Sequence, residues 1–312
     1  MPYPYNIETI NKRAVDDPKG FALECEAIYN RKVMEAAASI SERAEQSRVV
    51  FLSGPSGSGK TTTAMKICDA IKNLGIHAHT ISMDMYFLAS DREEAPRTDD
   101  GEHDLESPYC LDLELLNEHF YKLDKGDEVI IPHFCFNNQD RDLSKGAPLR
   151  LGDDEIVIFE GIHALNDMLA DEHPNAFKLY ISARSDIEKN REVCFKRTWT
   201  RLLRRVVRDE LFRGMGASRT INMWANVREG EKKYISPFKY KADLLFDSSM
   251  AYEVPIMKQL AYKALNEVPA GTERLDELRS LLPALVEFEA IDSAVVPPES
   301  ILREFIGGGI YS

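Results

Sequence analysis

Residues 49–61 read VVFLSGPSGSGKT, and this stretch decides the fold. Its apolar start predicts a buried strand, and the eight residues from Gly54 to Thr61 fit the pattern G-x-x-x-x-G-K-[ST]. Glycines at these positions let the backbone wrap closely around a phosphate chain, with N–H groups pointing at phosphate oxygens. A loop that only joined a strand to a helix would not need Lys60 and Thr61 after its last glycine. The stretch therefore predicts a nucleotide-binding loop.

The loop positions have separate predicted tasks. Lys60 is expected to reach the β- and γ-phosphates of the nucleotide, and the Thr61 hydroxyl is expected to bind Mg²⁺. The backbone N–H groups and hydroxyls around them are expected to bind the remaining phosphate oxygens. The full set of predicted nucleotide-binding residues is Gly54, Ser56, Gly57, Ser58, Gly59, Lys60, Thr61 and Thr62.

Composition limits the class of protein. The chain has 312 residues, enough for one large α/β core with appendages, and 44% of them are hydrophobic. No apolar run approaches the roughly 20 residues that cross a bilayer, and the N-terminus lacks a basic segment followed by an apolar one. We therefore expect a cytoplasmic protein without a membrane partner. The five scattered cysteines are expected to be reduced and mostly buried thiols.

Charge is distributed unevenly along the chain. The formal net charge of −13 argues against a nucleic-acid partner for the protein as a whole. Residues 191–241, however, hold 14 Lys and Arg against 5 Asp and Glu, a local charge of +9. A solvated helical face is the ordinary explanation of such a run. Because a phosphate-binding loop lies elsewhere in the chain, we expect this basic segment to face a localised anion.

The remaining apolar runs predict a doubly wound α/β fold with a mostly parallel sheet. Strands are expected at residues 48–53, 77–83, 156–159, 178–182 and 243–246, with a helix at 60–74 after the loop. Segments 90–107 and 132–152 are polar and turn-rich, and we expect functional loops there. We predict a helical N-terminal extension at 1–46, a core at 47–270 and a C-terminal helical tail that packs on the core at 271–312.

Two acidic residues follow predicted strands. Asp84 comes after the strand near residues 77–83, and Glu160 ends the run at 156–159. In open parallel sheets the ligand crevice lies beyond the carboxyl ends of the strands, so both side chains are expected there. Asp84 is then placed to accept a proton from a hydroxyl group, and Glu160 to hold Mg²⁺ directly or through water.

The basic segment predicts an amphipathic helix with a face rich in arginine. Arginine binds phosphate oxygens with a planar pair of donors, and a mobile helix at about 195–216 could close as a lid over the triphosphate. Gly214 and Gly216 would end the helix and permit hinging. We expect two or three of its arginines to contact phosphate, among Arg201, Arg204, Arg205, Arg208 and Arg213.

A GTPase switch is not supported. Such proteins carry an N-K-x-D motif that reads guanine and a D-x-x-G motif, and neither follows the loop in this sequence. ATP is therefore the expected phosphoryl donor.

Together these motifs resemble the uridine kinase and phosphoribulokinase family of P-loop kinases, over most of residues 47–265. Besides the loop, the similar segments are DMYF at 84–87, HDLESP at 103–108, PHFCF at 132–136 with Arg141, VIFEG at 157–161, and RDELFRG at 208–214. A bacterial uridine-kinase-like subgroup also resembles the chain at 224–231 and 301–308.

The resemblance implies an ATP- and Mg²⁺-dependent kinase of nucleoside-kinase-like fold. Asp84 would be the base at the acceptor hydroxyl, and Thr61 with Glu160 would form the magnesium site. Lys60 and the lid residues Arg204, Arg208 and Arg213 would stabilise the transferred phosphoryl group. Tyr86 and Arg141 would line the acceptor pocket, together with Phe134 and Gln139.

One departure from the family concerns the acceptor. Uridine kinases read the pyrimidine with a tyrosine and a histidine in the stretch that matches 134–139, whereas this chain has Phe134 and Gln139. A site built to bind polar groups of its substrate discriminates strongly against molecules that lack them. We therefore expect Phe134 and Gln139 to change which acceptor the site selects. The leading hypothesis is the 5′-hydroxyl of a nucleoside of the uridine or cytidine type. A sugar or polyol acceptor, and a non-catalytic ATP-binding regulatory module, are the alternatives. A second copy of the chain, in a homo-oligomer, is the other partner considered.

Overall fold

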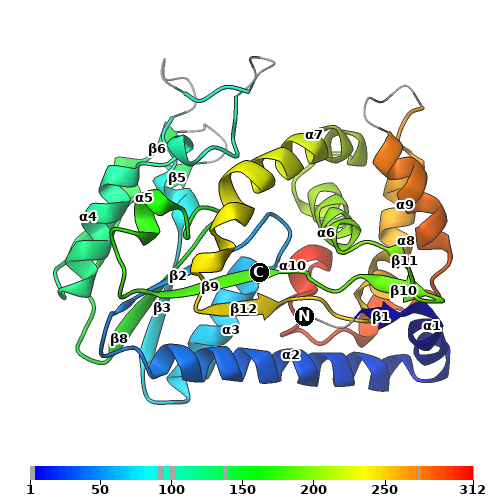
Figure 1. Cartoon of the computed structure of the whole chain (residues 1–312), viewed down its shortest axis with the longest axis horizontal. Coiled ribbons are helices and arrows are strands. Elements are labelled where there is room, and N and C mark those ends of the chain that lie inside the picture. The colour runs from blue at the N-terminus through cyan, green and yellow to red at the C-terminus, as the bar shows by residue number, and fades with distance from the viewer. Residues whose placement is uncertain are drawn as a thin grey trace.

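The computed structural model describes residues 4–89, 95–98, 101, 103–135, 140–270, 272 and 275–311. Its central feature is a five-stranded parallel sheet (Figure 1) in the order β12-β9-β2-β8-β3. The predicted doubly wound α/β fold is confirmed. The strands are β2 (Val49–Ser53), β3 (His77–Ser82), β8 (Glu155–Glu160), β9 (Phe177–Ser182) and β12 (Leu244–Asp247).

Alternate residues of the central strand β2 enter two separate cores. Val50 and Leu52 belong to the larger apolar cluster, whereas Val49 and Phe51 belong to the smaller one. Successive side chains of a strand point to opposite faces of the sheet, so a continuous apolar run requires cover on both faces. The five residues of β2 are all buried.

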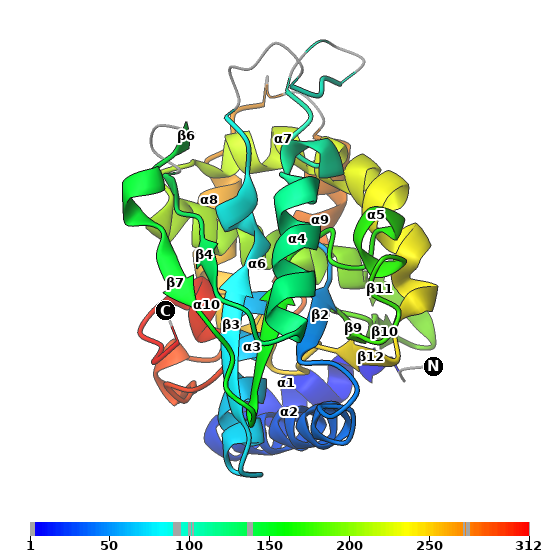
Figure 2. The same cartoon turned by 90° about the vertical axis from the view of Figure 1, so that its left-hand side faces the viewer.

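Helices cover both faces of the sheet. The larger cluster includes residues of α2 (Pro18–Ser41) and α3 (Lys60–Lys72), and Figure 1 shows α2 running along the lower side of the sheet. The smaller cluster includes residues of α4 (Leu113–Asp124) and α5 (Asp167–Ala170). Figure 2 shows α4 at the front of the molecule, with α2 below the sheet.

Strand register brings the ends of three strands to one edge. Leu52 of β2 lies opposite Glu160 of β8, and Ser82 of β3 also lies opposite Glu160. The phosphate loop follows β2, and the short helix η1 (Met83–Tyr86) follows β3. The loop, Glu160 and Asp84 therefore lie next to one another at the carboxyl ends of these strands.

The N-terminal segment adds two helices and a small sheet. The helices α1 (Ile7–Asp16) and α2 form where the sequence predicts helical structure, and nine residues of α2 are buried. The sheet joins β1 (Tyr5–Asn6), β10 (Ile187–Lys189) and β11 (Glu192–Phe195), and the sequence analysis did not predict it. Asn190 and Arg191 both have positive φ, as a two-residue turn with the twist of a hairpin requires.

The arginine-rich segment forms α6 (Arg197–Phe212), but this helix is not an exposed lid. Ten of its residues are buried, among them Leu202, Leu203, Val206 and Val207 in the larger cluster. The helices that follow α6 in the described part of the chain are α7 (Ala217–Gly230), the π-helical η4 (Glu231–Ile235), η5 (Ser236–Lys241), α8 (Glu253–Asn266), α9 (Asp276–Val286), η6 (Ser293–Val295) and α10 (Arg303–Ile306).

The two polar segments contain little regular structure. The stretch at 132–152 forms short pairs, and part of each segment lies outside the described residues. The elements within and directly beside these segments are η2 (Pro108–Cys110), β4 (Val129–Ile131), β5 (Phe134–Cys135), β6 (Asp140–Arg141), η3 (Leu143–Lys145) and β7 (Ala147–Leu149). No helix in the described part of the chain is both long and apolar enough to span a membrane. Of the five free cysteines, Cys25 and Cys110 are buried and the others half-buried.

Candidate active site

The phosphate loop requires glycine at specific points. A Cβ atom on Gly54 would lie 2.1 Å from the carbonyl oxygen of Ile181, so β9 leaves no room for a side chain there. Gly57 and Gly59 have φ of +75° and +83°, which glycine adopts without strain. Gly59 is the N-cap of α3 and contributes no side-chain cap. The first N–H groups of α3 can therefore bind an anion, as the sequence predicts.

Neighbouring elements hold the loop from two sides. Ser58 is buried, and its carbonyl oxygen accepts a hydrogen bond of 2.7 Å from the hydroxyl of Ser248. Ser56 is held by α6, because Arg201 donates to its carbonyl oxygen at 3.2 Å and Arg205 to its hydroxyl at 2.9 Å. The loop is thus fixed by contacts that the glycine pattern alone does not reveal.

Thr61 and Glu160 lie together at the end of the sheet. The Thr61 hydroxyl donates to Oε1 of Glu160 at 3.1 Å. Burial raises the pKa of Glu160, a nearby Lys60 opposes the rise, and Asp84 adds to it. A hydroxyl and two carboxylates offer the hard oxygen donors that Mg²⁺ prefers, so the residues present fit a magnesium ion.

Asp84 and Lys60 face the same space. Burial raises the pKa of Asp84, and the positive charges of Lys60 and Arg213 oppose this rise. The ammonium group of Lys60 lies 3.5 Å from the carbonyl oxygen of Pro55. A carboxylate whose pKa is raised is a stronger base, so this arrangement can accept a proton from a hydroxyl beside the phosphate loop.

These groups line one cavity of about 590 Å³. It extends from the loop to the strand-end acids and to the end of α6. The residues that line it are Ser56, Gly57, Gly59, Lys60, Thr61, Thr62, Asp84, Phe87, Leu105, Glu106, Glu160, Ile162, Arg205, Arg208, Arg213, Met215, Arg219, Met223, Glu304 and Tyr311.

Comparison of this sequence with known protein families agrees with the geometry of the site. The model of the phosphoribulokinase / uridine kinase family matches residues 49–255, about two thirds of the chain. The chain belongs to this family. It is therefore a kinase, with the phosphate loop and the strand-end acids inside the matched region.

Individual relatives agree with the family assignment. The chain is 27% identical to a uridine kinase of Staphylococcus haemolyticus over 209 residues, which are 67% of this chain and 91% of that protein. It is 24% identical to a uridine kinase of Halobacterium salinarum over 229 residues, which are 73% of this chain and 92% of that protein.

A solved structure resembles the fold. It is a putative fructose transport system kinase from Silicibacter sp. TM1040, with a TM-score of 0.50 and 22% identity. The similarity covers 69% of this chain and 98% of that one. At this identity the likeness concerns the fold alone.

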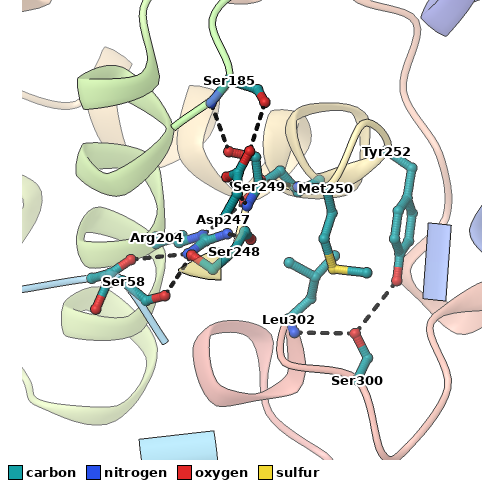
Figure 3. A network of polar contacts seen from close by, with 12 residues as sticks. Ser58, Ser185, Arg204, Asp247, Ser248, Ser249, Met250, Tyr252, Ser300 and Leu302 are labelled. Atoms are coloured by element: carbon teal, nitrogen blue, oxygen red, sulfur yellow. Dashed lines mark hydrogen bonds and ion pairs between the residues drawn. The ribbon is translucent and has the colours of Figure 1, made fainter. Parts of the chain in front are cut away.

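The expected role of Arg204 in this kinase is wrong. Its side chain is fully buried, and Nε donates to Glu253 at 2.7 Å. Its other nitrogens donate to the carbonyl oxygens of Gly57 and Ser248 at 3.1 and 2.8 Å. Figure 3 shows Arg204 beside Ser58 and Ser248, within this network. Arg204 therefore supports the loop from inside the core and does not face a phosphate.

Arg208 and Arg213 line the cavity, as the sequence analysis expects, and so does Arg205. All three also lie near the buried carboxylate of Asp209, with Arg208 at 2.9 Å, Arg213 at 3.7 Å and Arg205 at 3.8 Å. Asp209 offsets part of their charge and keeps them on one side of α6. Their predicted contact with phosphate remains a prediction.

Two expectations for the acceptor pocket are corrected. Tyr86 is fully buried, and its hydroxyl pairs with Nδ1 of His119 at 2.9 Å. Arg141 donates to the carbonyl oxygens of Tyr86 and Phe87, at 3.1 and 3.2 Å, and to Asp112 at 3.0 Å. Neither side chain lines the cavity. Both side chains lie behind the wall of the cavity, where they hold the segment that carries Asp84 and Phe87.

Phe134 and Gln139 have different outcomes. Phe134 is buried and packs against Phe87, with ring centroids 5.6 Å apart. It therefore supports Phe87, which lines the cavity in its place. Gln139 lies outside the described residues, so its predicted role stays a prediction.

Glu106 is a cavity residue to which the sequence analysis gave no role. Burial raises its pKa to about 7, and its Oε2 atom has no hydrogen-bond partner among the described residues. A Cβ atom on Gly230 would lie 2.3 Å from Cβ of Glu106, so the end of α7 packs closely against it. The sequence signal that points to Glu106 is the acidic segment at 103–108. This segment resembles the family, but the resemblance does not show which of its acidic residues faces the cavity.

The C-terminal tail also reaches the cavity, which the sequence analysis missed. Glu304 accepts from the Thr62 hydroxyl at 2.8 Å, and the Tyr311 hydroxyl donates to Asp69 at 2.7 Å. A Cβ atom on Gly59 would lie 2.1 Å from Cδ1 of Ile301, so the tail touches the loop itself. Figure 3 shows Ser300 and Leu302 joined to each other close to Tyr252. The sequence predicts a tail that packs on the core, but it does not indicate that this tail reaches the phosphate loop.

Proposed function

We propose that this kinase transfers the γ-phosphoryl group of ATP to a primary hydroxyl of a small molecule, with Mg²⁺ as cofactor. One observation carries the proposal. Asp84, Lys60 and the Thr61–Glu160 pair line a single cavity at the carboxyl ends of the strands. Phosphoryl transfer needs positioning and charge stabilisation more than covalent chemistry, and these groups supply both.

Each residue has a proposed role. Asp84 accepts the proton of the acceptor hydroxyl as that oxygen attacks the phosphorus. Lys60, Arg208 and Arg213 stabilise negative charge on the phosphoryl oxygens. Thr61 and Glu160 hold Mg²⁺, which supplies further positive charge at the phosphates when it is bound.

For the acceptor we propose the 5′-hydroxyl of a nucleoside of the uridine or cytidine type. The relatives named as uridine kinases over two thirds of the chain support this proposal. A sugar or polyol is the second candidate. It is favoured by Phe134, which stands where the family has a polar base reader and packs on Phe87 instead.

Release of ADP from ATP in the presence of separate nucleoside and sugar panels tests both candidates. Turnover with uridine or cytidine supports the first, and turnover with sugars alone supports the second. Asp84→Asn should abolish turnover, whereas Asp154→Asn, an exposed aspartate away from the cavity, should not. Full activity of Asp84→Asn would remove the proposed base. ATP binding without turnover on any acceptor would favour a regulatory ATP-binding module.

A further inference from the structure

A second cavity of about 200 Å³ lies beyond the end of β9, between the start of α6 and the segment η4–η5. It shares no lining residue with the larger cavity. At about 30 Å³ per water molecule its volume suits a ligand of a few heavy atoms. The residues that line it are Tyr180, Ser182, Ala183, Arg184, Arg197, Thr198, Arg201, Arg228, Glu231, Ser236, Lys239 and Leu245.

The lining is strongly positive. Arg184, Arg197, Arg201, Arg228 and Lys239 face a single carboxylate, so the formal charge of the described lining is +4. That carboxylate belongs to Glu231, which is already shared by Arg201 at 2.5 Å and by Arg228.

Two of the cations lack a carboxylate partner among the described residues. Within the described ranges no carboxylate lies at ion-pair distance from the side chains of Arg184 and Lys239, although Arg197 pairs with Asp186 at 3.3 Å. Hydroxyls of Ser182, Thr198 and Ser236 add donors to the same wall. Converging cations and hydroxyls with one shared carboxylate are a binding surface for a multiply charged anion.

Arg201 connects this cavity to the phosphate loop. It is 2% exposed, and burial lowers its pKa, although the guanidinium stays charged. Besides Glu231 it donates to the carbonyl oxygen of Ser56 at 3.2 Å. Ser56 lines the larger cavity. One guanidinium therefore contacts both sites.

We propose that this second cavity binds the phosphate group of a small metabolite, or inorganic phosphate, and that its occupancy changes nucleotide affinity at the loop through Arg201 and Ser56. A phosphate dianion offsets the charge better than a monocarboxylate and accepts bonds from several arginines at once. Coupling between sites is reciprocal, so nucleotide binding should alter anion affinity by the same factor.

The test must separate this cavity from the phosphate loop, which also binds phosphate. The probes are inorganic phosphate and glycerol 3-phosphate, with glycerol as the uncharged control, titrated calorimetrically at constant ionic strength. In the phosphate titrations every protein carries Lys60→Ala, so that the loop adds no binding of its own, and Arg184→Ala/Lys239→Ala is introduced in that background to test the cavity. Arg191→Ala/Lys232→Ala removes the same charge from exposed positions outside both cavities and serves as the matched control.

We expect the Lys60→Ala protein and the matched control to bind phosphate, and the Arg184→Ala/Lys239→Ala protein to bind it at least tenfold more weakly. Binding of both probes would identify a phosphomonoester site, and binding of phosphate alone an inorganic phosphate site. Equal affinity of the cavity variant and the matched control would overturn the proposal. The absence of phosphate binding to the Lys60→Ala protein would overturn it as well.

The link to the loop has its own readout. The dissociation constant of ATP, measured with and without saturating glycerol 3-phosphate, should change severalfold in wild type and stay constant in the cavity variant. An unchanged value in wild type would overturn the link through Arg201. Because no acceptor is present in these titrations, their outcome is independent of the proposed nucleoside kinase activity.

Discussion

One carboxylate oxygen of Glu304 accepts hydrogen bonds from both the backbone N–H and the hydroxyl of Thr62, at 3.4 and 2.8 Å. Thr62 lies in the first turn of α3, where free N–H groups and the helix dipole favour a phosphate. Glu304 lies 242 residues further along the chain. A carboxylate of the C-terminal tail thus holds donors that the sequence assigns to the nucleotide.

Replacing Glu304 with glutamine should therefore tighten ATP binding. The neutral amide competes less well for the Thr62 donors and removes a negative charge from beside the phosphates. A hydrogen bond to a charged group contributes about 1.5 kcal/mol, so we expect roughly a tenfold lower dissociation constant. Titration of ATP into both proteins measures it. Glu299→Gln is the control, since Glu299 contacts α3 through its backbone oxygen. Weaker ATP binding in Glu304→Gln would show instead that the carboxylate assists the nucleotide.

Arg204→Ala should destabilise the protein severely. The change leaves Glu253 buried without its partner and frees the carbonyl oxygens of Gly57 and Ser248. Breaking a buried pair in this way costs about 3–5 kcal/mol of unfolding free energy. Urea denaturation measures the loss. In an Arg204→Met/Glu253→Gln protein the uncompensated charge is gone, and part of the stability should return. Equal loss in the single and double variants would contradict the charge-pair explanation.

Arg213→Ala should act on catalysis and leave stability nearly unchanged. Its side chain is half exposed, and Asp209 keeps Arg208 and Thr220 as partners without it. If Arg213 stabilises the transferred phosphoryl group, kcat/KM should fall at least tenfold, whereas surface changes shift unfolding free energy by only about 0.5 kcal/mol. Steady-state kinetics and urea denaturation on the same sample separate the effects. Unchanged kinetics would remove Arg213 from the proposed machinery.

Glu106 should make stability depend on pH. Burial raises its pKa from 4.5 to about 7, so between these values the folded protein binds more protons than the unfolded chain. The contribution is complete below pH 4.5 and is lost as the pH rises through 7. At about 1.36 kcal/mol per pKa unit the full loss is on the order of 3 kcal/mol. Urea denaturation from pH 5 to pH 8 should show this decline in wild type and a smaller one in Glu106→Gln. Parallel curves for the two proteins would rule Glu106 out as its source.

Local patterns predicted the donor side of the site well. The apolar runs located all five strands of the central sheet within about two residues, because a strand covered on both faces needs a continuous apolar sequence. The loop, Asp84 and Glu160 then followed from chain order, since parallel strands end at one edge. The pattern of arginines predicted α6 but not its burial. Periodicity shows that charged residues share a helix, and only the surrounding elements decide whether each one meets solvent, a carboxylate or a carbonyl oxygen.

The sequence by itself determined the family, the parallel sheet and the phosphate-binding loop. These features depend on patterns of residues close together in the chain, or on the ends of parallel strands, which this fold class brings to one edge of the sheet. Only the tertiary structure decided that Arg204 supports the loop from within, that Tyr86 and Arg141 stand behind the cavity, and that the tail brings Glu304 to Thr62. These relationships join segments from tens to more than 200 residues apart. Long-range packing sets them, and no local pattern encodes which partner a buried charge will find.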